Sequence, residues 1–247
     1  MITRAEHVMG TVVSFLVEVG ELSVETVENV LDEACEELHR LDNRFSPWKP
    51  ESELSLLRDG TAVGSSALMD EVFELCAHAS NISEGFFDPW RMPGGFDPTG
   101  LVKGWAAERA LSIVAQGGIT AALVNAGGDI CVLSGKTYEV GIRHPLSPNA
   151  LCAVVPTTSA IATSGTYERG DHLIHPFGGE VAAVSATVTG GRLATTDALA
   201  TALAVGGTAV LHLLEAMENV EGFFISPNGS LFKTSNMIFS KSDQPVV

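Results

Sequence analysis

Apolar residues recur at three- and four-residue spacing along several stretches of the chain, and this period predicts amphipathic helices. The clearest case runs from 23 to 45, where Val27, Leu31 and Leu38 share one face and Ser23 occupies the N-cap position. Further helices are predicted over 66–80, over 101–118, around the apolar stretch that follows Leu193, and over about 208–217.

Short apolar runs bounded by Gly, Pro, Asn and Ser predict strands between these helices. The predicted strands cover 11–19, 119–126, 130–135, 138–143, 151–155 and 181–188. The stretch 222–234 predicts a hairpin with Asn228-Gly229 as its turn. Because helices and strands interleave without regular βαβ units, repeats or linkers, we expect one α+β domain over 1–247.

The composition supplies a core and limits the partners. Hydrophobic residues make up 45% of the 247 residues, and the formal net charge is −16. So acidic a chain disfavours nucleic acid and anionic membrane surfaces. A ligand that carries phosphate would need a local positive feature, such as a helix N-terminus, a metal ion or a well-placed Lys.

The cysteines and the N-terminus suggest a reducing compartment. Cys35, Cys76, Cys131 and Cys152 form no C-x-x-C pair, which favours free thiols. The start of the chain has no apolar leader or lipid-accepting Cys, and no segment is apolar enough for a membrane span. We expect a cytoplasmic protein, although an exported form with its signal removed would read the same way.

Two glycine-containing stretches are candidates for ligand contact. In "FDPTGLVKGW" (96–105), Asp97 precedes a predicted helix and Lys103 lies near its first turn, which suits a phosphate. The alternative is that Asp97 or Thr99 caps the helix and Lys103 is solvated. In "VNAGGDI" (124–130), two glycines after a strand permit either close approach of a ligand or a simple hairpin turn, and the turn is favoured.

The polar stretch "SGTYERGDHLIHP" (164–176) is a candidate functional loop. It contains His172 and His175, but no third ligand lies nearby, so a zinc site is not expected. One functional histidine on a loop and an ordinary solvated loop both remain open.

The run "GRLATTDALATALAVGG" (191–207) has one acidic residue in an otherwise apolar helix. Asp197 and Thr201 are four positions apart and therefore share a face, and their hard oxygens suit Mg²⁺. The alternative is that Thr195, Thr196 or Asp197 caps the helix and Thr201 bonds to the preceding turn.

Eight short motifs, in this order, resemble those of the FAD:protein FMN transferase (ApbE) family. They are "MGT" (9–11), "FSPWKPESEL" (45–54), "GFFDP" (85–89), "DPTGLVKG" (97–104), "NAGGD" (125–129), "SGTYER" (164–169), "HLIHP" (172–176) and "DALAT" (197–201). The resemblance implies a two-lobed, T-fold-related α+β architecture with a mixed or antiparallel sheet, flanking helices and a nucleotide cleft between the lobes.

The resemblance also implies a reaction and its partners. A family member cleaves the pyrophosphate of FAD with Mg²⁺, joins FMN to a Thr or Ser of an acceptor flavoprotein by a phosphoester, and releases AMP. Two alternatives use the same site: a Mg²⁺-dependent FAD pyrophosphatase that yields FMN and AMP, and a FAD-binding protein without turnover.

The implied roles carry over residue by residue. Metal ligands would be Gly100 through its carbonyl, Asp197 and Thr201, and the catalytic base would be His172. Contacts to the flavin nucleotide would come from Met9, Trp48, Phe86, Phe87, Asp88, Asp97, Lys103 and Ile174. The chain departs from the family pattern in a short 90–96 segment, in Trp48 where Tyr is typical, and in His175 where Asp is typical.

Overall fold

The computed structural model describes residues 1–133, 136–166 and 173–240. Its helices are α1 (Val24–Phe45), α2 (Glu53–Arg58), α3 (Ala67–Ile82), α4 (Thr99–Gln116), α6 (Leu193–Gly206) and α7 (Thr208–Glu215). Its strands are β1 (Ile2–Val8), β2 (Thr11–Val17), β3 (Ala122–Ala126), β4 (Asp129–Leu133), β5 (Tyr138–His144), β6 (Ser147–Thr157), β7 (Ala160–Gly165), β8 (Ser185–Thr189), β9 (Glu221–Ile225) and β10 (Leu231–Lys233).

Two antiparallel sheets form the β-structure. The larger sheet has the order β1-β2-β3-β4-β7-β8-β9-β10, and β5 and β6 form a separate two-stranded sheet. Neighbours in the larger sheet are mostly consecutive in the chain, which suits hairpin connections. The predicted α+β class with a mixed or antiparallel sheet is therefore confirmed, in its antiparallel form.

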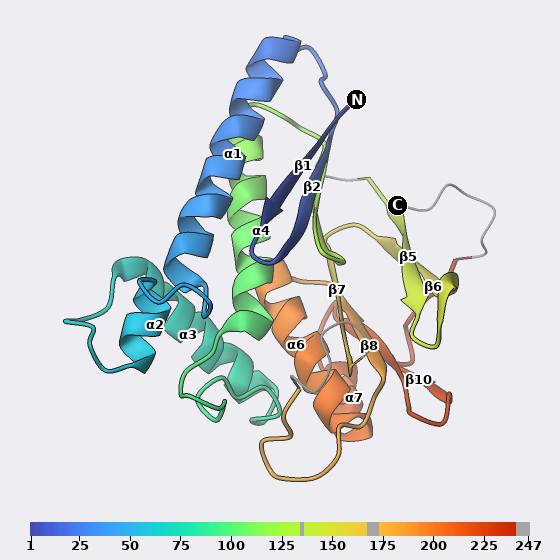
Figure 1. The fold of residues 1–247 in the computed structure, drawn as a ribbon. Helices are drawn as coiled ribbons and strands as arrows, with labels where there is room; N and C mark the ends of the chain where they lie inside the picture. The colour runs from blue at the N-terminus through green and yellow to red at the C-terminus, as the bar shows by residue number, and fades with distance from the viewer. Residues whose placement is uncertain (134–135, 167–172, 241–247) are drawn as a thin grey trace.

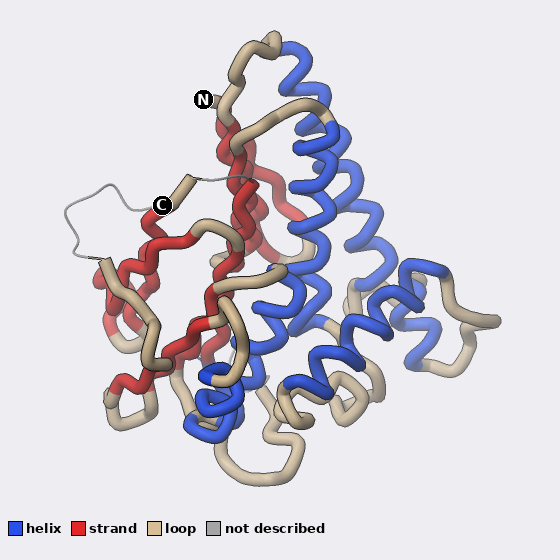
Figure 2. Tube along the Cα trace, turned by 180° about the vertical axis from the view of Figure 1, so that it is seen from behind, coloured by secondary structure: helices blue, strands red, loops and turns tan. Residues whose placement is uncertain are grey.

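Helices cover one face of the large sheet and the small sheet covers part of the other (Figures 1 and 2). On the helical side, Val13 and Phe15 of β2 are buried in one core together with Trp105 of α4. On the opposite side, Leu123 and Ile161 pack against the β5–β6 hairpin. The alternation of side chains along a strand sends neighbours to opposite faces, so the large sheet is covered on both faces.

Most predicted elements are confirmed, with shifted ends. Helix α1 begins after Ser23, whose hydroxyl accepts a hydrogen bond from the Thr26 amide, and α4 ends at Gly117. Strand β6 extends the predicted 151–155, and β8 begins at Ser185, later than predicted. The sequence prediction missed β1, α2 and β7. No helix among the described residues is both long and apolar enough to cross a membrane.

Helices α4 and α6 approach closely at Gly104. A Cβ placed on Gly104 would lie 2.7 Å from the Leu193 carbonyl oxygen and 3.1 Å from the Asp197 Cβ, so only glycine fits without a shift. The contact brings the first turns of α4 and α6 together, and both helices carry candidate site residues there.

Gly104→Ala should therefore destabilise the protein by about 1–3 kcal/mol, the usual cost of overpacking. The added methyl must push α4 away from α6, because backbone on α6 cannot yield as a side-chain tip can. Chemical denaturation measures the free energy of unfolding, with Ser112→Ala at an exposed position of α4 as the control. Equal stability of Gly104→Ala and Ser112→Ala would contradict the close packing.

Candidate active site

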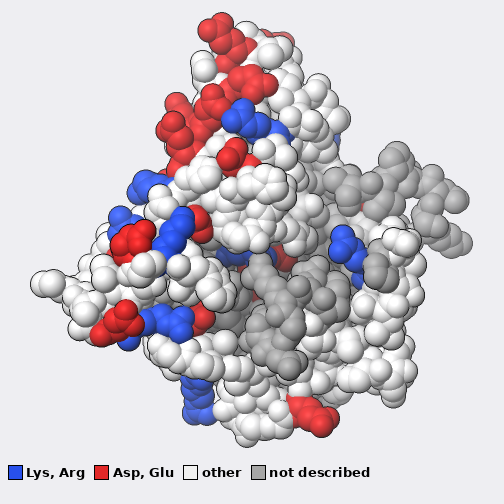
Figure 3. Space-filling view, in the orientation of Figure 1, with Lys and Arg blue, Asp and Glu red and all other residues white. Residues whose placement is uncertain are grey.

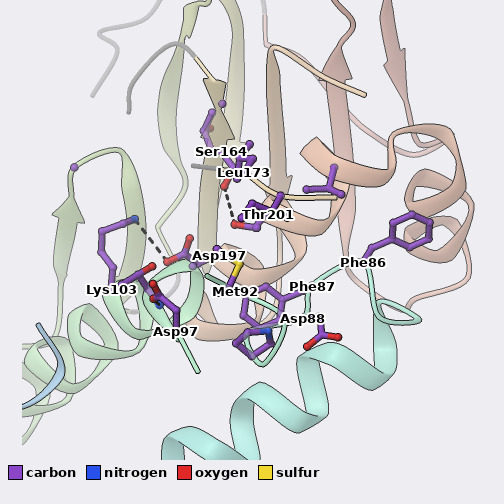
Figure 4. A pocket seen from close by; sticks show the side chains of 18 residues that line it. Phe86, Phe87, Asp88, Met92, Asp97, Lys103, Ser164, Leu173, Asp197 and Thr201 are labelled. Carbon is purple, nitrogen blue, oxygen red and sulfur yellow. Dashed lines mark hydrogen bonds and ion pairs between the residues drawn. The ribbon is translucent and has the colours of Figure 1, made fainter. Parts of the chain in front are cut away.

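A cavity lies at the start of α4 and along one face of α6, beside β7 and the Gly/Pro-rich segment that follows α3 (Figure 4). Its walls come from parts of the chain that are far apart in sequence. The lining residues are Phe86, Phe87, Asp88, Pro89, Met92, Asp97, Thr99, Gly100, Lys103, Gly127, Thr163, Ser164, Gly165, Leu173, Ile174, Asp197, Thr201 and Val205.

Charged side chains meet at one end of this cavity. The ammonium group of Lys103 forms an ion pair with Asp129 and lies 3.6 Å from Asp197 Oδ2. Asp129 is 2% exposed and Asp197 is 4% exposed. Buried carboxylates are costly unless they are paired or hydrogen-bonded, and Lys103 supplies a compensating charge to both.

Asp197 is not a helix cap. Helix α6 begins at Leu193 with Arg192 at the N-cap position, so Asp197 lies in its second turn. The Asp197 Oδ2 accepts a hydrogen bond of 3.1 Å from the Gly104 amide of α4. The capping alternative is therefore wrong for Asp197, whose carboxylate faces the neighbouring helix and Lys103.

Thr196 is not the N-cap residue of α6 either. Its hydroxyl donates to the Arg192 carbonyl at 2.9 Å, a bond to the preceding turn. Thr195 likewise lies inside the helix, past the N-cap position.

The Thr201 hydroxyl and the Gly100 backbone lie close to each other, and Thr201 shares a face of α6 with Asp197. Thr201 is one turn further along α6, and its hydroxyl lies 3.1 Å from Ser164 Oγ. A Cβ on Gly100 would lie 3.2 Å from Thr201 Oγ1, so the α4 backbone reaches the same point. Among the described residues, no group of three or more His, Cys, Asp and Glu could hold a metal. The donor set of one carboxylate, one hydroxyl and one carbonyl fits Mg²⁺ that takes further oxygens from phosphate and water.

The structure brings most of the predicted nucleotide contacts into this cavity. Those that line it are Phe86, Phe87, Asp88, Asp97, Lys103 and Ile174. Met9 and Trp48 line an adjoining pocket, and Thr99 and Lys103 line both. The Trp48 side chain is 88% exposed. His172, the predicted base, lies outside the described residues.

The Asp97 carboxylate has two partners, which hold the segment that precedes α4 in place. Its Oδ1 accepts a hydrogen bond of 3.0 Å from the Thr99 amide at the start of the helix, but Pro98 is the N-cap residue of α4. Lys103 is ion-paired with Asp129 and not solvated, so the capping alternative is wrong.

The Asp97 Oδ2 lies 3.3 Å from the Arg58 guanidinium, which also donates to the carbonyls of Pro93 and Gly94. Arg58 therefore ties the Gly/Pro-rich segment to the cavity wall.

The two glycines of "NAGGD" form the turn between β3 and β4, as the simpler interpretation expects. Gly127 and Gly128 have positive φ values of 63° and 102°, and the Gly128 amide donates to Asn125 Oδ1 at 2.8 Å. Gly127 also lines the cavity, so the turn places backbone against the ligand space.

Sequence reasoning missed three residues of this site: Arg58, Asp129 and Ser164. Asp129 ends a motif that was singled out, and its Oδ1 accepts a hydrogen bond of 3.1 Å from the Thr163 amide. Asp129 follows two glycines and precedes an apolar strand, and this position was the feature of the sequence that could have indicated a site residue. Arg58 lies in a six-residue helix with no motif, so no local pattern points to it.

Aromatic side chains cluster at one end of the cavity. Phe86, which lines it, makes edge contacts with the rings of His175 and Phe177, at centroid distances of 5.9 and 5.3 Å. Phe177 is 56% exposed. His175, where the family pattern has Asp, thus packs in an aromatic group beside the cavity.

The cysteines take no part in this site. All four are free. Burial raises the pKa of the Cys35 thiol to about 11 and that of the Cys76 thiol to about 12, so both stay protonated at neutral pH. Their free state agrees with the absence of a C-x-x-C pair in the sequence.

The protein has an α+β fold with an antiparallel sheet, a layer of helices and a cavity lined by Lys103, Asp197 and Thr201. Comparison with known proteins identifies the family to which this fold belongs. A sequence model of the ApbE family matches residues 9–94 and 91–224, and the chain belongs to this family. No curated protein sequence matches it.

Solved structures show the same fold at low sequence identity. The ApbE protein of Thermotoga maritima is 20% identical with a TM-score of 0.82, covering 95% of this chain and 97% of that one. The flavin transferase ApbE of Vibrio cholerae is 20% identical with a TM-score of 0.76 and the same coverage. The apo flavinyl transferase ApbE of Pseudomonas stutzeri is 17% identical with a TM-score of 0.77, covering 95% of each chain.

Proposed function

We propose that this protein is a flavin transferase that moves FMN from FAD to a Thr or Ser hydroxyl of an acceptor flavoprotein. The observation that carries the proposal is the buried group of Lys103, Asp129 and Asp197 beside the Thr201 hydroxyl and the Gly100 backbone. A pyrophosphate needs positive charge and hard-oxygen metal ligands at one place, and this end of the cavity offers both. Membership of the ApbE family and the names of its relatives support the proposal.

The residues divide the work as follows. Lys103 contacts the pyrophosphate, held in place by Asp129. Gly100, Asp197 and Thr201 are the residues that would hold Mg²⁺, which when bound neutralises charge on the phosphates and helps align them. Met9, Trp48, Phe86, Phe87, Asp88, Asp97 and Ile174 contact the flavin nucleotide.

The reaction exchanges one phosphorus–oxygen bond for another. The acceptor oxygen bonds to the phosphorus of the FMN half, the bond from that phosphorus to the bridging oxygen breaks, and AMP leaves with that oxygen. His172 takes the proton of the acceptor hydroxyl.

Incubation with FAD, Mg²⁺ and a candidate flavoprotein acceptor tests the proposal by intact-mass spectrometry. An acceptor heavier by FMN less one water, with AMP released in equal amount, supports it. Free FMN and AMP with an unmodified acceptor would instead identify a pyrophosphatase, and FAD that stays bound and intact would identify a binding protein.

Lys103→Ala should weaken FAD binding by about 1.5–3 kcal/mol, the worth of a charge-assisted hydrogen bond. The ammonium is the described cation closest to the predicted metal ligand Asp197. Flavin fluorescence titration measures the affinity, and Lys136→Ala at an exposed ion pair with Glu18 is the matched control. Equal affinity of Lys103→Ala and the control would remove Lys103 from the pyrophosphate site.

A further inference from the structure

A second and larger hollow adjoins the candidate active site on the other side of the glycine turn. It is a groove of about 1000 Å³ between the large sheet and the β5–β6 hairpin. Its floor includes Val12 and Ser14 of β2 and Asn125 of β3, and its wall includes β5. Gly127 and Thr163 line both this groove and the cavity of the candidate active site, so the two spaces are neighbours at these residues.

Strand β5 presents a free edge to this groove. Five consecutive residues, Val140 to His144, line it. Within the described ranges, β5 pairs with β6 alone, whereas the outer edge of β6 receives a hydrogen bond from the Ser240 amide to the Val154 carbonyl. The backbone donors and acceptors of a free edge are a template for an added strand.

The groove also carries an uncompensated positive charge. Arg143 is exposed on its wall, in a protein of net charge −16. Apart from Lys233, every other Lys or Arg in the described part of the chain has a carboxylate within ion-pair distance. Acidic side chains gather instead along α1, away from the hairpin (Figure 3). The charge of Arg143 therefore complements an anionic ligand.

We propose that this groove receives the target segment of the acceptor flavoprotein, as an extended chain added to β5 with a carboxylate side chain against Arg143. The proposal rests on the proposed transferase function. An extended segment on β5 would lead past Gly127 and Thr163 to the Lys103–Asp197 end of the cavity, where its Thr or Ser hydroxyl is needed. Main-chain bonds to β5 would give affinity, and Arg143 would select acidic segments.

Charge reversal at Arg143 tests the electrostatic part. The probes are two synthetic peptides with one Thr each, identical except that acidic residues in one are Lys in the other. The wild type should modify the acidic peptide more efficiently, and Arg143→Glu should lower kcat/KM for that peptide about tenfold or more, mainly through KM. Lys233→Glu, at the other described cation without a carboxylate in ion-pair distance, should behave as wild type. FAD affinity should be unchanged in both variants.

Backbone methylation tests the added strand. Two acidic peptides are N-methylated at alternate residues, one at the odd and one at the even positions. Only one of them loses the N–H donors that face β5, so that peptide should be modified far more slowly than the other. Amides of 140–144 should also gain hydrogen-exchange protection when the unmethylated peptide binds. Equal modification of both methylated peptides, without added protection, would overturn the added strand.

The remaining outcomes separate the two proposals. Weaker FAD binding by Arg143→Glu would assign the groove to the nucleotide and overturn docking of the acceptor. An unchanged peptide preference in Arg143→Glu, or modification of a folded acceptor protein but of neither peptide, would also overturn it. Release of FMN and AMP without any modified acceptor would overturn the transferase function itself.

Discussion

Asp197→Asn should produce a folded protein that transfers FMN at least about 100-fold more slowly at ordinary Mg²⁺ concentrations. Loss of a partner that only orients a metal ligand already costs about 10–100-fold, and a ligand should matter more. Asparagine keeps an oxygen that can accept the hydrogen bond from the Gly104 amide. It removes the negative charge that Lys103 faces and that would bind Mg²⁺, so the expected loss is in chemistry and not in packing.

The measurement is the initial rate of transfer as a function of Mg²⁺ concentration, together with thermal unfolding. Asp59→Asn, at an exposed acidic residue, is the matched control and should follow the wild type. A partial rescue of Asp197→Asn at high Mg²⁺ would agree with a weakened site. Wild-type Mg²⁺ dependence in Asp197→Asn would refute the metal assignment and leave this carboxylate with a structural role between α4 and α6.

The fold could be predicted where a local pattern is strong. Helix α1 has a full apolar stripe and a serine cap, and its bounds agree with the prediction. Strand β7 was missed because Ala160, Ile161 and Ala162 are all buried, and a strand covered on both faces shows no alternation. Strand β1 is an edge strand whose less exposed positions include Arg4 and Glu6, so its sequence shows no apolar alternation, and α2 is too short to show a helical period.

Residues of the candidate site could be predicted where they belong to a sequence motif. Their contacts with distant parts of the chain could not be predicted. Position 197 stands out as an acid in an apolar helix, yet its sequence permits a cap as readily as a contact across helices. The decision comes from the Gly104 amide, which lies 93 positions away in the chain and meets Asp197 only because α4 and α6 pack together. The ion pair of Lys103 with Asp129 is of the same kind, since it joins α4 to the start of β4.

His172→Ala should slow transfer by roughly 10²–10⁴-fold, the usual contribution of a positioned general base, while FAD binding survives. His172 lies outside the described residues. The next residues in the chain, Leu173 and Ile174, line the cavity, as do Ser164 and Gly165 on the other side of the segment. The described residues on both sides of the segment therefore line the cavity, which is consistent with the role that the family resemblance implies for His172.

The matched control is His175→Ala, because His175 is a neighbouring histidine that contacts the rings of Phe86 and Phe177 and accepts a hydrogen bond from the Phe177 amide at Nδ1. Loss of that ring should disturb packing beside the cavity and weaken nucleotide binding modestly, without the large fall in transfer rate at saturating FAD. Single-turnover transfer with preloaded FAD distinguishes the two, because it reports the chemical step alone. Removal of the base should also flatten the pH dependence of that step. Full single-turnover activity in His172→Ala would move the base to another group, and His175 and Asp88 would be the next residues to replace.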